Sequence, residues 1–532
     1  MVENAAGALR KGNAGKIPFQ DTIKSLRKLT GSIVENKNMG ADLLFMSTYM
    51  AAITTAGVTR PEIFAYTAER REYVPTKYVQ KVQYYVKRWN YSYVEGLLLV
   101  AEKVKNEMLR SVLNRYANSI ESGIPDEDFL ERELGTIRSV YRNTYEQGLE
   151  LLKKWGDAYI AMLFSASLVA IIIMISVAIY SPEGIESSLN TSYMIILVIS
   201  VMGLSIMYRA VPQDDRTHTM PVYCSREQGM IRRMERLVVP TIIVACILLY
   251  LLGTGFGIMF LLTGILLAPL GIIGFIDDTH IIHRDRDFST FIRSLGSVMG
   301  GKGITTIFAL AEVDRKSLEH LEPLINSVYS KLNLGLDEKM CWERFIGESG
   351  SNLIYKYMNI FRDSVELGGS PDKIGQIIGS SMLEQVLLRE KRDMLCKGFI
   401  VLLIPMHAAM AGIFLFLFYI LLMMSKAITA VMGQFAESSS ALSGSSSATS
   451  SGAMTGMNLF VNFPEAQMTT YVVTILVLIT ISNILAGKIV AGGDRYMLYF
   501  FASILCIITG LIFIVAPVIV GMFFNLPGMG VT

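Results

Sequence analysis

Two short stretches, GIPD (Gly123–Asp126) and GSPD (Gly369–Asp372), recur 246 residues apart, each a short distance before a long apolar run. Glycine readily adopts the left-handed backbone that ends a helix. Proline suits the first position of the next helix, where no amide hydrogen is needed, and aspartate in that turn interacts favourably with the helix dipole. Each stretch therefore predicts a corner between two helices. The residues assigned to these corners are Gly123, Pro125, Asp126, Gly369, Pro371 and Asp372.

A second pair of glycines keeps the same spacing. Gly57 and Gly303 are also 246 residues apart, and each lies between segments that we predict to be helical. The stretches 129–152 and 374–396, which follow the two corners, carry apolar residues at helical spacing, and neither half contains a convincing run of strands. A duplicated helical-bundle domain explains the matching order and spacing.

The composition indicates an integral membrane protein. Of the 532 residues, 52% are hydrophobic and 18% are charged, whereas soluble domains carry about 25% charged residues. A membrane-spanning helix needs about 20 apolar residues. Seven stretches qualify, namely 158–180, 192–208, 237–253, 256–276, 398–424, 469–487 and 497–524. We expect an all-α polytopic membrane protein with about seven transmembrane helices, the third and fourth forming a tight hairpin, and two cytoplasmic helical-bundle domains.

The placement of Lys and Arg orients the chain, because these residues concentrate in cytoplasmic segments. If the N-terminus is cytoplasmic, Lys426 is the only Lys or Arg that falls outside. We therefore predict a multi-pass protein of the cytoplasmic membrane. Its predicted parts are a basic N-terminal segment (1–39), a first cytoplasmic helical domain (40–157), four membrane helices (158–276) with a cytoplasmic loop (209–236), a second cytoplasmic helical domain (277–397), a membrane helix (398–424), an external Ser/Gly-rich loop (425–468) and two membrane helices (469–524).

This layout resembles a known family. Tandem cytoplasmic helical domains, each marked by a Gly-x-Pro-Asp corner and each followed by a membrane span, are similar to the F-type platform proteins of type II secretion systems and type IV pili. Four spans after the first domain and three after the second resemble the archaeal members, above all the platform protein of the archaellum. The resemblance implies a hexameric secretion-type ATPase and pilin-like or archaellin-like subunits as partners. It also implies a homodimer.

Three motifs approach known chemistry without completing it. GSVMGGKG (Gly296–Gly303) has the spacing of a phosphate-binding loop, but Gly303 stands where Ser or Thr would bind Mg²⁺. AGGD (Ala491–Asp494) lacks the first Gly of the membrane aspartyl protease motif, and no second intramembrane Asp completes a catalytic dyad. His280 and His283 are spaced to share a helix face, but a polar exit from the membrane explains them more simply. We therefore predict no enzymatic activity, no cofactor and no metal site.

Two polar residues lie within predicted spans. His407 and Asn483 should face the interior of the membrane bundle and form hydrogen bonds there, since unpaired polar groups are costly in lipid. A proton relay is the alternative. No acidic residue, Lys or Arg lies deep in any span, which disfavours a transporter or channel.

The charge differs between the two predicted cytoplasmic domains. Residues 1–156 carry 23 Lys and Arg against 18 Asp and Glu, whereas residues 277–397 carry 16 against 18. The net charge of the whole chain is +2, which gives no indication of nucleic-acid binding. Four arginines of the loop 209–236 are candidates for contact with lipid headgroups or an acidic partner, namely Arg226, Arg232, Arg233 and Arg236.

Together these observations predict a non-enzymatic membrane platform. It would couple a cytoplasmic secretion-type ATPase to the insertion of pilin-like subunits into an archaellum or a type IV pilus-like filament. A membrane transporter or channel is the alternative function.

Overall fold

The computed structural model describes residues 39–180, 185–212, 214–220, 222–441 and 464–523. Within these ranges the regular elements are all α-helices, accompanied by an isolated bridge between Thr217 and Ser351. The predicted all-α fold is confirmed.

Seven of the helices are long and apolar enough to cross a membrane, as predicted. They are α6 (Asp126–Tyr180), α7 (Ile185–Ala210), α8 (Arg226–Leu251), α9 (Phe256–Lys302), α14 (Pro371–Ala441), α16 (Glu465–Ala491) and α17 (Met497–Phe523). The predicted hairpin between the third and fourth spans is also confirmed, because α8 and α9 are separate helices joined by a turn in which Gly253 has a φ of +68°.

The shorter helices lie in two groups along the chain. The first group consists of residues 39–54, α2 (Arg60–Glu69), α3 (Thr76–Trp89), α4 (Tyr93–Lys103) and α5 (Glu107–Glu121). The second group consists of α10 (Thr306–Glu312), α11 (Glu322–Asn333), α12 (Glu338–Ser349) and α13 (Asn352–Glu366).

The chain divides into two compact units. The first runs to Tyr141 and includes Arg362–Ser370, and the second contains Arg142–Phe361 and everything from Pro371 onward. These units cut across the predicted domains, whose boundaries stay a prediction. We call residues 39–54, α2–α5 and the start of α6 the first bundle. The second bundle is α10–α12, α13 up to Phe361 and the adjoining parts of α9 and α14.

The first unit has an aromatic core. The ring of Phe64 on α2 stacks on Tyr116 of α5, with 5.7 Å between centroids, and Tyr116 stacks on Phe129 of α6 at 5.0 Å. The N-terminus of α6 is held by an ion pair between Asp126 and Arg60. Side chains of large volume therefore separate the helices of the first bundle.

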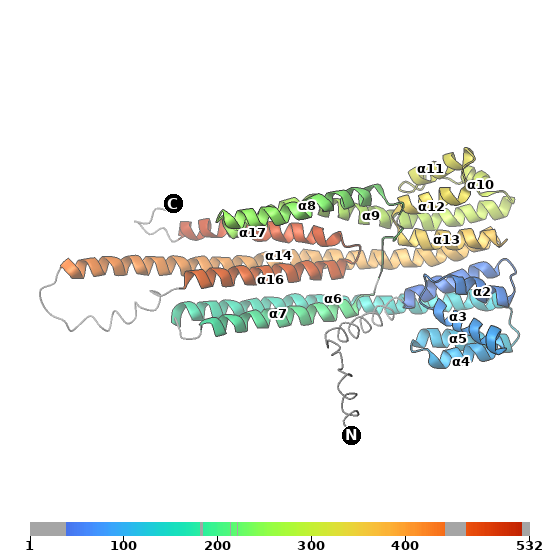
Figure 1. The fold of residues 1–532 in the computed structure, drawn as a ribbon, viewed down its shortest axis with the longest axis horizontal. Helices are drawn as coiled ribbons and strands as arrows, with labels where there is room; N and C mark the ends of the chain where they lie inside the picture. The colour runs from blue at the N-terminus through green and yellow to red at the C-terminus, as the bar shows by residue number, and fades with distance from the viewer. Residues whose placement is uncertain (1–38, 181–184, 213, 221, 442–463, 524–532) are drawn as a thin grey trace, which may run out of the picture. The chain divides into compact units, whose positions relative to one another are not determined.

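The second unit contains the long apolar helices, which run alongside one another (Figure 1). Its centre is α16. In the most apolar 18-residue stretch of α16, 56% is buried, whereas none of the corresponding stretch of α8 is buried. Helices α9 and α17 touch at their backbones: a Cβ added to Gly264 would lie 2.8 Å from the amide nitrogen of Ile507, and one added to Gly271 would lie 2.7 Å from the Cα of Phe500. Small residues permit such close packing of helices in lipid.

The helix order of the first half recurs in the second. Helix α2 begins at Arg60 and α10 at Thr306, which is 246 residues later. Two further pairs follow at intervals of 245 residues, since α5 and α13 begin at Glu107 and Asn352, and α6 and α14 begin at Asp126 and Pro371. The duplicated order predicted from the glycine spacing is therefore present in the structure.

The predicted glycine corners agree with the backbone at three positions and differ at the fourth. Gly57, Gly303 and Gly123 have positive φ angles of +66°, +60° and +71°. In the second Gly-x-Pro-Asp stretch the left-handed residue is Gly368, at +89°, and not Gly369 as predicted. The reason is that α13 ends one residue earlier than the spacing suggested, so that the amide of Gly369 donates to the carbonyl of Ser364, as the amide of Ile124 does to Ser119 in the first corner.

The two prolines also differ by one position. Pro371 is the first residue of α14, as predicted, whereas Pro125 directly precedes the first residue of α6. Asp126 and Asp372 both lie in the first turn of their helices. The two corners are thus alike in backbone geometry and in length, and only the position of the proline within them differs by one residue.

The structure corrects the predicted external loop. Helix α14 does not end near Met424 but continues without interruption to Ala441. Residues 425–441 contain no proline, so no residue of this stretch lacks the amide hydrogen that a helix needs. The rest of the predicted Ser/Gly-rich loop, up to residue 463, lies outside the described residues.

Candidate functional site

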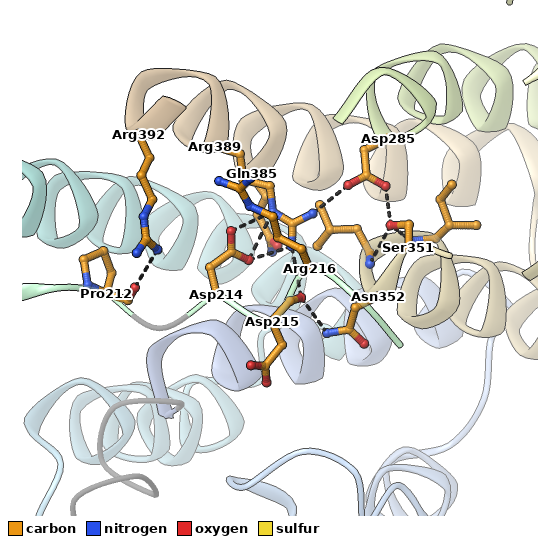
Figure 2. A network of polar contacts seen from close by, with 12 residues as sticks. Pro212, Asp214, Asp215, Arg216, Asp285, Ser351, Asn352, Gln385, Arg389 and Arg392 are labelled. Atoms are coloured by element: carbon orange, nitrogen blue, oxygen red, sulfur yellow. Dashed lines mark hydrogen bonds and ion pairs between the residues drawn. The ribbon is translucent and has the colours of Figure 1, made fainter. Parts of the chain in front are cut away.

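A buried polar network lies in the second unit, where the segment between α7 and α8 meets α9, α14, α16 and the start of α13 (Figure 2). Its charged members lie outside the predicted membrane-spanning stretches. Three arginines and three aspartates form its core, namely Arg216, Arg389, Arg392, Asp214, Asp278 and Asp285.

Arg389 on α14 is the centre of this network. Its Nη1 donates to Asp285 of α9 at 2.6 Å, and its Nε and Nη2 donate to the carboxylate of Asp214 at 2.8 and 2.6 Å. The side chains of Arg389 and Asp285 are 3% and 0% exposed. Because burial of an unpaired charge is very costly, each of these groups depends on the others.

Burial and neighbouring charges set the pKa values of Asp285, Asp214 and Arg389. Burial raises the pKa of Asp285 to about 6, although Arg389 opposes the shift. For Asp214 burial acts in the same direction, but the guanidinium groups of Arg389, Arg216 and Arg392 outweigh it, and the pKa is lowered. Burial alone would lower the pKa of Arg389, yet the two carboxylates raise it above its ordinary value. Asp285 is therefore protonated more readily than Asp214, which stays charged together with Arg389.

Arg392 fixes the end of a membrane helix. Its Nε and Nη2 donate to the carbonyls of Val490 and Ile489 at 3.2 and 3.0 Å, at the C-terminus of α16. Its Nη1 donates to the carbonyl of Pro212, at 3.1 Å. A cation at this position satisfies terminal carbonyls and complements the helix dipole. The side chain thereby ties α14, α16 and the α7–α8 segment together.

Asp277 on α9 holds the start of α8. It accepts hydrogen bonds from Ser225 Oγ at 2.8 Å and from Gln228 Nε2 at 3.1 Å, and Ser225 also caps α8 through the amide of Gln228. Burial raises the pKa of Asp277 to about 6, and the hydrogen bonds from Ser225 and Gln228 only partly counter it. This carboxylate is therefore a second weak acid at the base of the hairpin.

The α7–α8 segment also docks on the second bundle. His218 Nε2 lies 3.0 Å from the carbonyl of Gly347 on α12, and the amide of Asn352 donates to the carbonyl of Arg216 at 2.9 Å. A Cβ added to Gly347 would overlap the Cβ of Tyr223, at 2.1 Å. The segment is therefore wedged between α12–α13 on one side and α14–α16 on the other.

A separate hydrogen-bonded chain lies at membrane depth. Nδ1 of His407 on α14 is 3.0 Å from Asn483 Nδ2 on α16, and its Nε2 is 2.9 Å from Thr509 Oγ1 on α17. Tyr159 on α6 extends the chain by donating to Asn483 Oδ1 at 3.3 Å, and its hydroxyl also lies 2.7 Å from Ser482 Oγ. The predicted interior pairing of His407 and Asn483 is confirmed. These neutral groups hold four helices in register.

The arginines predicted to contact lipid or a partner are not members of either network. All four lie on α8 and are exposed, and in the described part of the chain none forms an ion pair with an acidic side chain; they are Arg226, Arg232, Arg233 and Arg236. Their role stays a prediction.

The motifs considered for chemistry have structural positions. GSVMGGKG lies at the end of helix α9 and forms no loop, with Gly296 packed on the carbonyl of Pro371. His280 lies 3.2 Å from Glu227, and the ring of His283 stacks on His320 at 4.5 Å. No group of three His, Cys, Asp or Glu side chains suited to a metal ion occurs in the described ranges.

Sequence reasoning missed the network because its partners are far apart along the chain. Asp214 and Arg389 are separated by 175 positions, and Asp285 and Arg389 by 104. A signal was present: Gln385, Arg389 and Arg392 recur at helical spacing and form a polar stripe on one face of α14. In the sequence alone Arg389 and Arg392 counted only among the Lys and Arg residues of the predicted cytoplasmic domain 277–397.

The fold and the network define a class: a polytopic α-helical membrane protein in which polar helical bundles continue directly into membrane helices. Residues 46–174 match the family described as Type II secretion system (T2SS), protein F. The match covers most of the first bundle and the first apolar span.

Two curated relatives are similar to a larger part of the chain. Flagella accessory protein J of Methanococcus voltae is 23% identical over 328 residues, which cover 59% of this chain and 58% of that protein. Flagella accessory protein J of Methanocaldococcus jannaschii is 21% identical over 359 residues, which cover 65% of this chain and 63% of that protein. The chain thus spans about six tenths of the length of these relatives. No solved structure matches it significantly.

The resemblance inferred from the sequence, to F-type platform proteins and to their archaeal members, is confirmed by these matches. Residues 46–174 are thus similar to T2SS protein F, and about six tenths of the chain is similar to two proteins named flagella accessory protein J.

Proposed function

We propose that the protein is the membrane platform of an archaellum or a type IV pilus-like filament, and that it couples a cytoplasmic hexameric ATPase to the insertion of pilin-like subunits. The platform has no enzymatic activity of its own and receives its energy from that partner. Its N-terminus and both bundles would lie in the cytoplasm, where the Lys and Arg residues concentrate.

The continuity of the long helices carries this proposal. Helix α6 leaves the first bundle, and α9 and α14 connect the second bundle to the membrane, without a break between the polar and the apolar part. An α-helix rises about 1.5 Å per residue, and a helix without a break carries a displacement of one end along its whole length. Any force applied to the bundles would therefore move membrane helices directly.

The buried network supports the same mechanism. Arg389 and Arg392 attach α14 to the α7–α8 segment, and that segment contacts α12 and α13. Movement of the second bundle would thus reach α16 as well as α9 and α14. The exposed arginines of α8 would remain free to contact anionic headgroups during this movement.

The experiment is deletion of the gene and complementation in its own host. We expect surface filaments to disappear in the deletion strain and to return with the wild-type gene, and we expect the purified chain in detergent to bind a secretion-type ATPase. Filaments that persist in the deletion strain would refute the platform function. A substrate-dependent flux in liposomes would favour a transporter, and no residue of the described structure favours that function at present.

A further inference from the structure

An apolar groove lies among the membrane helices of the second unit, at the end that is far from the second bundle (Figure 1). It has a volume of about 430 Å³ and is formed by the turn between α8 and α9 together with α9, α14, α16 and α17. Phe256, Phe418 and Phe513 contribute aromatic walls, and none of the lining residues is charged. We call it the distal groove.

The distal groove is open to the surface that faces lipid when the long helices span a membrane. Ile258 and Ile514 line the groove and are 45% and 40% exposed. In the adjoining turn, Leu251 and Leu252 are 79% and 67% exposed. The groove is thus continuous with an apolar surface that hydrocarbon covers, so a lipid chain can enter it without displacing a helix.

One glycine of the groove is not explained by the fold. Gly255 precedes α9 with a φ of −58° and a ψ of 145°, which other residues adopt readily, and a Cβ added to it would have no heavy atom within 4 Å. It also leaves α9 without the side-chain cap that Ser or Asp would supply. Gly257 differs, because a Cβ added there would lie 2.7 Å from the Cβ of Phe513. Close packing therefore accounts for Gly257, whereas the missing side chain of Gly255 keeps the groove open.

A tyrosine brings a hydroxyl without a partner to the groove. Tyr419 on α14 is half-buried, and in the described part of the chain no residue forms a hydrogen bond with its hydroxyl. The two threonines of the lining differ, because Thr254 and Thr469 donate to main-chain carbonyls of their own helices at 2.8 Å. Tyrosine is enriched where a membrane meets water, since its ring is apolar and its hydroxyl reaches the headgroups. Tyr419 is therefore placed to donate to an oxygen of a bound lipid.

The volume of the groove distinguishes a lipid chain from a helix of another protein. An α-helix is about 10 Å across, and half of the hydrocarbon core is about 15 Å deep, so a helix that crossed this depth would fill about 1,200 Å³. The groove offers about 430 Å³, which is far too little for a helix. A hydrocarbon chain is much thinner, and the uncharged lining suits it.

We propose that the distal groove binds one membrane lipid. A hydrocarbon chain of the lipid packs between Phe418 and Phe513, and an oxygen at the polar end of that chain accepts a hydrogen bond from Tyr419. The bound lipid joins the α8–α9 turn to α14, α16 and α17, and it fills a space that the chain itself leaves open. This site does not depend on the identity of the filament or of its ATPase.

The test measures the lipid that stays bound to the full chain after purification in a mild detergent. Native mass spectrometry compares the wild type with Val473→Trp, which fills the groove from α16, and with Tyr419→Phe, which removes only the hydroxyl. We expect about one retained lipid per chain in the wild type and none in Val473→Trp. After removal of lipid, phosphatidylglycerol should rebind to Tyr419→Phe about fivefold more weakly than to the wild type, because one hydrogen bond is lost. The matched control is Ile481→Trp, which places the same ring on an exposed part of α16 about two turns away and should retain the lipid.

A photoreactive side chain identifies the occupant in the cell membrane. Ile514→benzoylphenylalanine places the reactive ketone at the edge of the groove. Irradiation of whole membranes should add the mass of a lipid to the chain, and Val473→Trp should suppress this product.

Three outcomes would overturn the proposal. The wild type retains and rebinds no lipid, although circular dichroism and thermal unfolding show a folded chain. Val473→Trp and Tyr419→Phe bind lipid as well as the wild type does, which would indicate unspecific association with the apolar surface. The photoreactive side chain cross-links to a protein and not to a lipid, which would assign the groove to a partner helix.

Discussion

The two bundles share their helix order and differ in how their helices are held. In the second bundle α9 and α14 meet backbone to backbone, since a Cβ added to Gly375 would lie 2.8 Å from the carbonyl of Ile292. At the 245-residue interval between α6 and α14, the position that corresponds to Gly375 in the first bundle is Leu130, a buried side chain of larger volume. Duplication has therefore kept the path of the chain and has changed the spacing of the helices.

The charges show the same divergence. Arg389 and Asp285 anchor the second bundle to the α7–α8 segment, whereas the corresponding positions of the first half, 245 and 246 residues earlier, are Thr144 and Met39, which cannot form this ion pair. Conversely, the first bundle exposes the stacked rings of Trp89 and Tyr91, whereas the second bundle has leucines at the equivalent positions, Leu334 and Leu336. The two copies therefore differ both in the groups that they bury and in the side chains that they expose.

The largest effect should come from breaking the anchor. Arg389→Met leaves Asp214 and Asp285 buried without their cation, and removal of one partner from a buried ion pair typically costs about 3–5 kcal/mol. The measurement is unfolding in mixed micelles with increasing dodecyl sulfate. The control is Lys391→Met, two positions away, whose ion pair with Glu146 is half exposed and should contribute about 0–1 kcal/mol. Equal losses in the two variants would show that the network is not an anchor.

The second effect is a pH dependence at Asp277, the carboxylate of α9 that holds the start of α8. The pKa of Asp277 is raised in the folded state to about 6, above its ordinary value, so the folded protein binds this proton more tightly than the unfolded chain. The resulting stability is fully present below about pH 4 and is lost as the pH rises through about 6, a change of about 2–3 kcal/mol. Asp277→Asn should remove this part of the pH dependence when unfolding is compared at pH 5 and pH 7.5.

The control for this measurement is a carboxylate that is not enclosed. Asp393→Asn changes a residue on α14 that pairs with Lys397 one turn away, and this variant should retain the wild-type pH dependence. A wild-type stability that rises between pH 5 and pH 7.5 with the same slope in Asp277→Asn would contradict the assignment.

The third effect separates two glycines of α9. A Cβ added to Gly296 would lie 2.3 Å from the carbonyl oxygen of Pro371, whereas nothing lies within 4 Å of one added to Gly301. Gly296→Ala should therefore destabilise the protein by about 1–3 kcal/mol through overpacking. Gly301→Ala should stabilise it by about 0.5–1 kcal/mol, because alanine favours the helix. If both substitutions changed the free energy of unfolding in the same direction in the micelle assay, the close backbone contact at Gly296 would not be a distinguishing feature of the second bundle.

The sequence predicts those features that depend on local chemistry. Apolar length gives the seven long helices, and the glycine spacing gives the duplicated corners at Gly57 and Gly303. The one-residue error at Gly369 arose because a spacing cannot locate the last turn of α13. The predicted end of α14 near Met424 was wrong because a tract rich in Ser and Ala can form a helix as well as a loop.

Contacts between distant segments could not be predicted in the same way. Arg389 recognises Asp214 and Asp285 through the packing of three separate segments, and a single sequence contains no record of that packing. His407 and Asn483 were predictable as interior residues because lipid excludes polar groups, but their direct contact required the structure.

The smallest effect concerns what the two bundles have in common. Gly57 and Gly303 both adopt left-handed backbone, with φ of +66° and +60°, and no heavy atom lies within 4 Å of a Cβ added to either. Gly57→Ala and Gly303→Ala should therefore each cost about 1 kcal/mol, from backbone conformation alone. The measurement is the same micelle unfolding assay, and equal losses would show that the corner is a shared requirement of the backbone. A clearly larger loss in one bundle would mean that its corner has acquired contacts of its own, and the divergence of the two copies would then extend to the backbone.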